Sequence, residues 1–460
     1  MTLKEELAQL LGTDAVSDDA ETLAAHSHDK WFANHAPEAV VFAQTTEQVS
    51  KLLAFANERG IPITPRGGGV GYVGGCVPAR GGIALSLARM NRIKEIHAAD
   101  GVAVVEPGVI TGELQAAVRQ LGLYYPPDPA SLKECTLGGN IATNAGGPRC
   151  LKYGVTRSYV LGLEVVLANG DVLRTGGRTH KNKTGFDLVG LFTGSEGLLG
   201  VVTEATLRLI PLPPARATIS ASFATFPEAA NAVQRVLGAG FLPAALEIAD
   251  AFTLKSAREH LGTSIVPDGE GHLLIDLDGQ SASVQSELAA LGKLVRELGA
   301  VHLQEAFGEA ACEALWELRR QFSDSLKATG LTKLNEDIVV PRGRLVDLAE
   351  FAAYLREKYG YPVACFGHAG DGNVHTNIMA ADYDKPEVKE RVARALDELF
   401  TQVLAWGGAI TGEHGIGMAK QRWWEQAASP VSQSVHEALK QALDPKGILN
   451  PGKFVSGQME

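Results

Sequence analysis

RGGGVGYVGG, residues 66–75, is a stretch dominated by glycine, and GVGYVG at residues 69–74 matches the dinucleotide fingerprint G-x-G-x-x-G. That fingerprint must open a helix, whereas Pro78, Gly81 and Gly82 follow here and disfavour one. The match is therefore rejected. The stretch predicts a run of backbone N–H groups that could form a phosphate-binding concavity without a helix, and a plain glycine-rich turn is the alternative.

A second glycine stretch, CTLGGNIATNAGG at residues 135–147, alternates glycines with small polar side chains. Such a pattern suits hydrogen bonds from backbone and hydroxyl groups to a large, flat, polar ligand. The stretch follows PPDPAS at residues 126–131, which resists regular structure. The two glycine stretches together predict one ligand-binding region in the first half of the chain.

The elements around these stretches are predicted from hydrophobic periodicity. A strand is expected at 39–42, and Thr45 with Gln48 offers a capping box for a helix that Gly60 ends. Asn169 and Gly170 form a hairpin signal. Further elements expected in this half are strands at 102–106, 160–167, 172–174 and 201–209 and a helix at 114–121.

PLPP at residues 211–214 reads as a stiff linker, and the pattern changes after it. The order becomes strand, helix, strand, strand, helix, strand, which is the ferredoxin-like split βαβ arrangement. These elements are expected at 218–223, 227–237, 246–249, 272–277, 284–298 and 302–305, followed by a helix at 313–327 and a strand at 335–340.

Two fragments near the C-terminus carry candidate metal ligands: GHAGDGNVH at residues 367–375 and GEHG at residues 412–415. His368 and His375 are seven apart, so both reach one ion only if the chain turns between them. Two imidazoles and a carboxylate are a common first shell for a divalent metal such as zinc. Hydrogen-bonded loop histidines are the alternative.

Composition and charge narrow the class of protein. The 460 residues are 45% hydrophobic and 21% charged, which predicts a globular protein of two or three domains. A net charge of −11 without a basic tract argues against nucleic acid. Five scattered cysteines without C-x-x-C favour a reducing compartment. With no long apolar run and no signal peptide, we expect a cytoplasmic protein, peripheral at the inner membrane only through a partner.

Taken in order along residues 35–455, the motifs resemble those of the FAD-linked oxidases of the vanillyl-alcohol oxidase/p-cresol methylhydroxylase fold. The similar branch is that of D-lactate dehydrogenase, the glycolate oxidase D subunit and D-2-hydroxyglutarate dehydrogenase. The motifs that carry the resemblance are the two glycine stretches, GSEGLLGVVT at 194–203, the two histidine fragments and NPG at 450–452.

The resemblance implies an α+β fold: a two-lobed FAD-binding domain, a ferredoxin-like α+β cap and a helical C-terminal part. We expect the FAD-binding domain at 1–212, completed by 440–460, and the cap with its metal site at 213–439. Residues implied at the FAD are Pro65, Arg66, Gly67, Gly68, Gly69, Val70, Gly71, Ser131, Thr136, Gly138, Gly139, Thr143, Ala145, Val201, Val202 and Asn450. Many members attach FAD through a histidine in the first glycine loop, and none stands at 67–75, so non-covalent FAD is expected. Cys135 is read as a small buried residue.

The resemblance also assigns roles around the histidine fragments. His368, His375 and Glu413 match the family's metal ligands, with zinc preferred over manganese or iron, and His414 matches its catalytic base. Arg319 matches the arginine that anchors the substrate carboxylate. Further residues implied at the substrate are Ser323, Lys333, Asn373 and Asn377. The family's lysine for a longer diacid has no clear match, because the corresponding strand reads KLNED at 333–337. This departure argues against 2-hydroxyglutarate as the preferred substrate, and Lys333 is the residue that could replace that lysine.

The hypothesis is oxidation of a D-2-hydroxy acid, such as D-lactate or glycolate, to the 2-oxo acid. In it the metal chelates the substrate, His414 takes the hydroxyl proton, and hydride passes to flavin N5. Without a nicotinamide or cluster motif, the electron acceptor is expected to be a quinone, an electron-transfer flavoprotein or an iron–sulfur subunit, and a homodimer is allowed. The alternatives are a D-2-hydroxyglutarate dehydrogenase, a non-catalytic flavin subunit of a glycolate oxidase-like complex, and a metal-dependent hydrolase.

Overall fold

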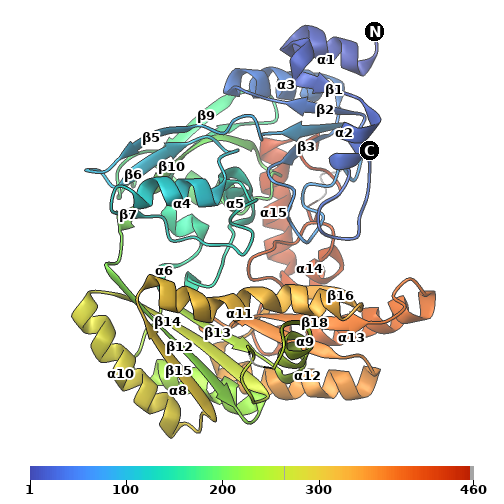
Figure 1. Ribbon diagram of the computed structural model, residues 1–460. Helices are drawn as coiled ribbons and strands as arrows, with labels where there is room; N and C mark the ends of the chain where they lie inside the picture. The colour runs from blue at the N-terminus through green and yellow to red at the C-terminus, as the bar shows by residue number, and fades with distance from the viewer. Residues whose placement is uncertain (264, 456–460) are drawn as a thin grey trace. The chain divides into compact units, whose positions relative to one another are not determined.

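The computed structural model describes residues 1–263 and 265–455. The chain divides into two compact units, each described here by itself (Figure 1). The first unit comprises Met1–Gly146, Val155–Leu212 and Glu413–Glu460, and the second comprises Gly147–Gly154 and Pro213–Gly412. None of the helices within the described ranges is long and apolar enough to cross a membrane.

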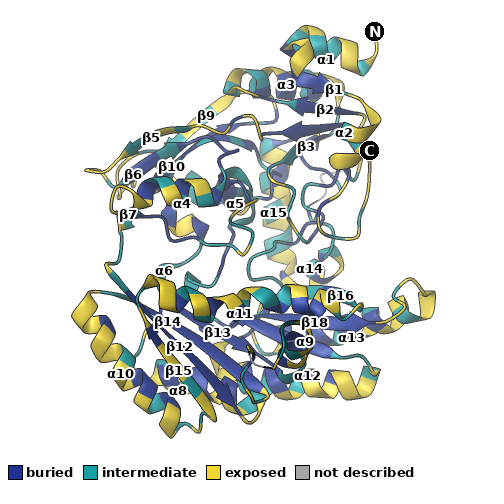
Figure 2. Ribbon diagram, in the orientation of Figure 1, coloured by how far each residue is buried: buried dark blue, intermediate teal, exposed yellow. Residues whose placement is uncertain are grey.

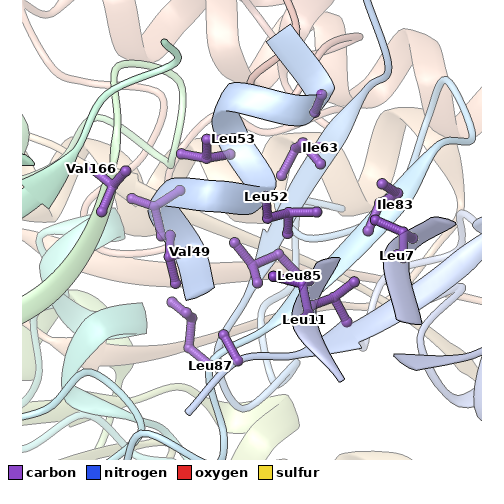
Figure 3. Packing of buried hydrophobic residues seen from close by; sticks show 14 of the residues in the cluster. Leu7, Leu11, Val49, Leu52, Leu53, Ile63, Ile83, Leu85, Leu87 and Val166 are labelled. Atoms are coloured by element: carbon purple, nitrogen blue, oxygen red, sulfur yellow. The ribbon is translucent and has the colours of Figure 1, made fainter. Parts of the chain in front are cut away.

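The first unit begins with a four-stranded sheet in the order β1-β2-β4-β3, formed by β1 (Val16–Ser17), β2 (Ala39–Phe42), β3 (Ile63–Arg66) and β4 (Ile83–Ser86). Strand β4 pairs in parallel with both β2 and β3. Helices α1 (Leu3–Leu11) and α3 (Thr46–Arg59) contribute apolar side chains to the core beside this sheet (Figure 3). Other short helices are η1 (Thr13–Ala15) and α2 (Ala20–Ala25).

The start of α3 corrects one prediction. Thr45 accepts a hydrogen bond from the Gln48 N–H, as expected of an N-cap, at 3.2 Å. The reciprocal half of the capping box is wrong, since Gln48 Oε1 accepts from the Gln44 N–H at 2.8 Å. Gly60 ends the helix in the left-handed region, with φ at +68°. Residues 67–82, all described, contain no helix, which confirms the rejection of the dinucleotide fingerprint.

A five-stranded sheet of the first unit has the order β5-β6-β10-β8-β9. Its strands are β5 (Ile93–His97), β6 (Val102–Val105), β8 (Val160–Val166), β9 (Val172–Gly176) and β10 (Val201–Arg208). Asn169 and Gly170 turn β8 into β9, as predicted, and Gly170 has φ of +90°. Shorter elements are α4 (Thr111–Arg119), α5 (Leu137–Thr143), η2 (Thr156–Tyr159), α7 (Leu188–Phe192) and the strand pair β7 (Leu123–Tyr124) and β11 (Ile210–Pro211).

The C-terminal segment returns to the first unit with helices α14 (Gln421–Ala427) and α15 (Pro430–Leu443). Beyond them, Leu449 lies beside Ile63 of β3 in a parallel bridge. The Ile63 N–H donates to the Ile448 carbonyl at 2.8 Å, and the Asn450 N–H donates to the Ile63 carbonyl at 2.7 Å. The end of the chain thus completes the edge of the first sheet.

The second unit is built on a seven-stranded sheet in the order β15-β12-β14-β13-β17-β18-β16. Its first four strands follow the split βαβ order that the sequence predicts. They are β12 (Ala215–Phe223), β13 (Ala245–Ala249), β14 (Gly271–Gly279) and β15 (His302–Phe307). Strands β17 (Val363–His368), β18 (Asn373–Ala380) and β16 (Thr332–Val339) extend it, and almost all the residues of β13, β14, β17 and β18 are buried (Figure 2).

Helices cover both faces of this sheet. One group, whose members contact one another, is α8 (Phe226–Gly238), α10 (Ser281–Glu297), α12 (Leu345–Tyr359) and α13 (Pro386–Ala405). The other group is α9 (Ala251–Leu261) and α11 (Glu309–Ala328), which enclose a cluster containing Phe322 and Phe366. The short helices α6 (Cys150–Tyr153) and η3 (Arg342–Arg344) complete the unit.

The bounds of the two compact units are close to those of the two predicted domains, but they do not show which unit binds FAD and which is the cap. Apart from Gly147–Gly154, the chain enters the second unit at Pro213, and it returns to the first unit at Glu413 rather than at residue 440. The predicted FAD-binding domain (1–212 with 440–460) and cap (213–439) stay predictions. The last residues of the predicted return, 456–460, lie outside the described residues.

Candidate active site

The hairpin of β17 and β18 carries the first two candidate ligands. In its antiparallel register Phe366 lies opposite His375 and His368 lies opposite Asn373. The two histidines are therefore diagonal neighbours on one face of the hairpin, with ring centroids 5.6 Å apart. Residues 369–372 supply the turn that the spacing required, and Gly372 takes φ of +87° there.

Glu413 supplies the carboxylate of the predicted metal set. One ligand atom from each of His368, His375 and Glu413 lies within 4.8 Å of the other two. Both histidines are buried and Glu413 is partly buried. Two imidazoles and one carboxylate at this separation fit a divalent transition metal with open positions for substrate.

Asp337 of β16 fixes the backbone just before Glu413. The Gly412 N–H donates to Asp337 Oδ2 at 2.8 Å, and the Thr411 hydroxyl lies 3.1 Å from the same oxygen. Asp337 is fully buried and lies opposite His375 in the sheet. The segment that leads to Glu413 is thereby tied to the strand beside the histidines.

Glu247 of β13 is a buried carboxylate that touches two predicted site residues. Its Oε1 lies 2.7 Å from His368 Nδ1, and its Oε2 accepts from Arg319 Nε at 2.6 Å. Burial disfavours the charged form of Glu247, but the charges and hydrogen bonds of His368 and Arg319 outweigh it and lower the pKa of this carboxyl to about 2. Glu247 is therefore a carboxylate.

The predicted substrate residues of α11 and β16 gather around Phe366. The guanidinium of Arg319 lies 5.1 Å from the centre of the Phe366 ring. Lys333 Nζ lies 6.0 Å from the same ring and donates to the Ser323 hydroxyl at 2.8 Å. Burial, reinforced by the charge of Lys327, lowers the pKa of Lys333 to about 8. Arg319, Ser323 and Lys333 thus lie together beside the histidine hairpin.

The two predicted asparagines have different surroundings. Asn373 Nδ2 donates to the Ile338 carbonyl at 3.0 Å, so this amide holds the hairpin against β16. Asn377 Nδ2 donates to the carbonyls of Ala364 and His375. Asn377 Oδ1 is buried without a hydrogen-bond partner among the residues that the structure describes. The Oδ1 atom of Asn377 can therefore accept a hydrogen bond from a ligand, whereas the Nδ2 group of Asn373 already donates to the Ile338 carbonyl.

His414, the predicted base, belongs to the first unit. Its ring stacks on Tyr72 with centroids 5.3 Å apart, and its Nε2 lies 3.8 Å from Glu413 Oε1. The following backbone is held by Glu196, whose two carboxylate oxygens accept from the N–H groups of Ile416 and Gly417 at 2.8 Å each. Burial raises the pKa of Glu196 despite these donors.

The structure brings the two glycine stretches together. A Cβ at Gly67 would collide with Thr136 Oγ1, and one at Gly68 would meet the Glu134 carbonyl. Gly69 takes φ of +67°. Only backbone without side chains can pack this closely, so the two stretches lie against each other; that they hold FAD stays a prediction.

Several of the residues predicted to contact FAD also stabilise the first unit itself. Arg66 donates to the carbonyls of His28, at 2.8 Å, and Ala25, at 3.2 Å. Thr136 caps α5 by accepting from the Gly139 N–H, while Val201 lies in the apolar core of the first sheet. The remaining predicted contacts lie on the two stretches or on β10, except Ser131, which ends the PPDPAS segment before the second stretch: Val70, Gly71, Ser131, Gly138, Thr143, Ala145 and Val202.

Asn450 joins three parts of the first unit. Its Nδ2 donates to the carbonyls of Gly75, at 2.9 Å, and Glu196, at 2.8 Å. Its Oδ1 is buried and unpaired within the described residues. Cys135 is buried as predicted, and all five cysteines are free.

Sequence reasoning missed three carboxylates that position the site: Glu196, Glu247 and Asp337. Two of them could have been found. Glu247 is the lone charge in the apolar strand ALEIA, and Glu196 stands in the quoted GSEG motif. A carboxylate inside an apolar strand is costly to bury unless it has a partner, so a lone acid in such a strand indicates a buried ion pair. Asp337 gave none, because its partners Thr411 and Gly412 are distant in sequence.

Two family models match the chain. The FAD binding domain matches residues 37–176, and the C-terminal domain of FAD linked oxidases matches residues 212–454. This chain belongs to the FAD-linked oxidases. The predicted oxidoreductase class and FAD cofactor are confirmed, and the hydrolase alternative is wrong for a member of this family.

Curated relatives of this FAD-linked oxidase match over nearly their whole length. Glycolate oxidase subunit GlcD of Bacillus subtilis is 40% identical, covering 98% of this chain and 96% of the relative. D-2-hydroxyglutarate dehydrogenase of Stutzerimonas stutzeri is 35% identical, covering 98% of each. D-lactate dehydrogenase of Anaerostipes hadrus is 33% identical, covering 95% and 94%. The predicted branch of the family is confirmed.

The fold also matches solved structures. p-Cresol methylhydroxylase with substrate bound superposes with a TM-score of 0.81, at 23% identity, covering 98% of this chain and 96% of that one. At this identity the likeness concerns the fold alone. It confirms the predicted α+β fold of the vanillyl-alcohol oxidase type.

Proposed function

We propose that this FAD-linked oxidase converts a D-2-hydroxy acid, such as D-lactate or glycolate, into the 2-oxo acid. The observation that carries the proposal is a cationic anchor on α11 beside a histidine of the β17–β18 hairpin: Arg319 and His368 share the carboxylate of Glu247. A 2-hydroxy acid offers the two groups that such a site would bind, a carboxylate and a neighbouring hydroxyl.

Arg319 would bind the substrate carboxylate. Its guanidinium is held through Nε, which leaves the two terminal nitrogens to meet a carboxylate as a fork. Asn377 would accept a hydrogen bond through Oδ1. A divalent cation held by His368, His375 and Glu413 would supply charge that lowers the pKa of the substrate hydroxyl.

His414 would take the proton of the 2-hydroxyl group. An imidazole is suited to this near neutral pH, because its ordinary pKa is about 6.5. The two glycine stretches would hold FAD without a covalent link, and the flavin would supply the acceptor for the hydride from C2. Reoxidation would use a non-nicotinamide acceptor: a quinone, an electron-transfer flavoprotein or a partner subunit.

Lys333 favours a second candidate substrate. Its Nζ donates to the Ser323 hydroxyl, and Lys333 and Arg319 both lie within 6.0 Å of the centre of the Phe366 ring. Two cationic side chains are therefore close to each other beside this ring. A diacid such as D-2-hydroxyglutarate could pair one carboxylate with each. A metal-free role as a non-catalytic flavin subunit is the other alternative.

Anaerobic reduction of the bound flavin distinguishes these possibilities. The purified holoprotein is mixed with D-lactate, L-lactate, glycolate, D-2-hydroxyglutarate or D-malate, and flavin absorbance is followed while metal is measured on the same sample. We expect rapid bleaching by one D-2-hydroxy acid or by glycolate and about one divalent metal per chain. Bleaching by none of them would contradict the proposal and favour the non-catalytic subunit.

A further inference from the structure

Glu247 is isolated within its own strand. Every other member of β13, ALEIA, is apolar and buried, and the Glu247 side chain is only 1% exposed. A buried carboxylate without partners is strongly destabilising, so the position of Glu247 depends on the groups it meets. The two it meets come from elsewhere in the second unit: His368 from β17 and Arg319 from α11.

Each oxygen of Glu247 serves one of these partners. Oε1 faces His368 Nδ1 at 2.7 Å, and Oε2 accepts from Arg319 Nε at 2.6 Å. Because a carboxylate only accepts, a His368 ring that binds a metal in its neutral form carries its proton on Nδ1 and presents the lone pair of Nε2. Because Arg319 is held at Nε, the orientation of its planar guanidinium is fixed as well.

We propose that Glu247 is a positioning residue that sets the ligating nitrogen of His368 and the direction of Arg319 at the same time. One carboxylate then aligns the metal ligand with the substrate anchor. The inference deepens the proposed function and rests on its metal site. Residues that orient metal ligands in this manner commonly change metal affinity by 10- to 100-fold when replaced.

Glu247→Gln is the sharpest variant, because it keeps the size of the side chain. An amide presents one accepting oxygen and one donating NH₂ group, so it cannot accept from both His368 and Arg319. If the NH₂ group faces His368, the ring must move its proton to Nε2 and lose its ligating lone pair. Either arrangement breaks one of the two contacts.

Asp276 offers a matched control in the same sheet. Asp276 lies on the adjacent strand β14, and its side chain is also 1% exposed. Its Oδ1 and Oδ2 accept from Arg216 Nε at 3.0 and 2.9 Å. Asp276→Asn therefore removes a buried carboxylate paired with arginine but touches no predicted ligand. His375→Ala serves as a reference for the loss of a ligand.

The test measures zinc affinity by competition with a chromophoric chelator, using the flavin-loaded protein and Zn²⁺ alone. We expect Glu247→Gln to weaken zinc binding 10- to 100-fold, and Asp276→Asn to change it less than twofold. A wild-type affinity in Glu247→Gln, or an equal loss in Asp276→Asn, would overturn the inference. Failure of the wild-type protein to bind zinc would instead overturn the proposed metal site.

Glu247→Asp keeps the test decisive if Glu247→Gln is not recovered as folded, flavin-containing protein. The aspartate keeps the charge but is one methylene shorter, so it cannot reach both donors. We expect zinc binding to weaken about tenfold. A wild-type zinc affinity in this folded variant would also overturn the inference.

Discussion

The surroundings of His414 involve both its side chain and the backbone that follows it. Its ring stacks on Tyr72, and Glu196 holds the two N–H groups that follow it. Removing the ring loses the stacking on Tyr72, but the contacts of Glu196 are with backbone N–H groups, so the backbone of the first unit should stay in place. The residue can therefore be tested without disturbing the glycine stretches.

His414→Ala should retain FAD but reduce the flavin with D-2-hydroxy acid 10²- to 10⁴-fold more slowly, because no other group would take the hydroxyl proton. Stopped-flow anaerobic reduction measures the rate, and the ratio of flavin to protein absorbance measures retention. His97→Ala, at an exposed position of β5, is the control. Reduction of the His414 variant at the wild-type rate would contradict its role as base.

Lys333 should make diacid binding depend on pH. Its pKa is about 8, so below pH 8 the ammonium can pair with a carboxylate, and above pH 8 that attraction is lost. Ser323, Arg319, Lys327 and Asp324 are the groups that surround it. The apparent KM for D-2-hydroxyglutarate should rise about tenfold from pH 7 to pH 9.

D-lactate provides the comparison, since it lacks the second carboxylate. The KM for D-lactate should show no rise with pH that depends on Lys333. Lys333→Met should raise the KM for D-2-hydroxyglutarate at pH 7 and should remove its increase between pH 7 and pH 9. Steady-state assays with a dye acceptor measure both. An unchanged profile in Lys333→Met would show that this lysine does not bind the substrate.

At the residue scale, the spacing of His368 and His375 and the family resemblance of Arg319 pointed to candidate site residues but not to the carboxylates that contact them. The structure places His368 and Arg319 on one carboxylate, that of Glu247, and the roles of these residues stay predictions. Glu247 and Asp337 were missed because their partners lie 72 to 121 and 74 to 75 residues away. Pairs so distant in sequence are set by strand order, which a local pattern does not contain.

At the element scale, the hairpin of β17 and β18 determines whether the two histidines face one side. Gly372 sits in its turn with φ of +87°, and a Cβ there would collide with the Val340 carbonyl. Gly372→Ala should destabilise the second unit by about 1–3 kcal/mol and weaken zinc binding, because both strain and collision displace His375.

Thermal unfolding and the zinc competition assay measure these two effects. Gly343→Ala is the matched control, because a Cβ at Gly343 would meet nothing within 4 Å and its φ is not positive. We expect the control to be neutral in both measurements. Wild-type stability and zinc affinity in Gly372→Ala would contradict the importance of the turn.

The order of elements after PLPP was predicted, because alternating periodicity and short loops describe a split βαβ unit well. Helices α9 and α12 were not. Helix α12 begins at Leu345 after a 3-10 turn, and its N-cap, Arg344, makes no side-chain cap. Helix α9 follows β13 directly, with Asp250 as the only separating residue. Asp250 caps α9 by accepting from the Thr253 N–H, but without a loop before it the helix is hard to separate from β13, and α12 lacks a side-chain cap altogether.

At the scale of the whole molecule, the first unit depends on the last residues of the chain. Ile448 and Leu449 are fully buried, and Lys440 Nζ donates to the carbonyls of Leu198 and Leu449. Burying each apolar side chain contributes about 1.5–3 kcal/mol. These contacts lie far from the glycine stretches in sequence but support the same sheet.

A chain that ends at Asp444 should therefore lose FAD or become insoluble, because β3 keeps β4 on one side but loses Leu449 on the other, and Lys440 loses the Leu449 carbonyl. A chain that ends at Val455 keeps every described contact and is the control. Soluble yield and the flavin-to-protein absorbance ratio measure the outcome. A soluble, fully flavin-loaded protein ending at Asp444 would contradict this dependence.

The bridge between Ile63 and Leu449 also has a consequence for biosynthesis. A ribosome adding 5–20 residues per second needs roughly 20–80 s to make the 386 residues that separate the two. During that time the edge of β3 stays open, next to the loop that begins at Gly67. We expect the nascent chain to need chaperone protection there and to acquire its cofactor only after release.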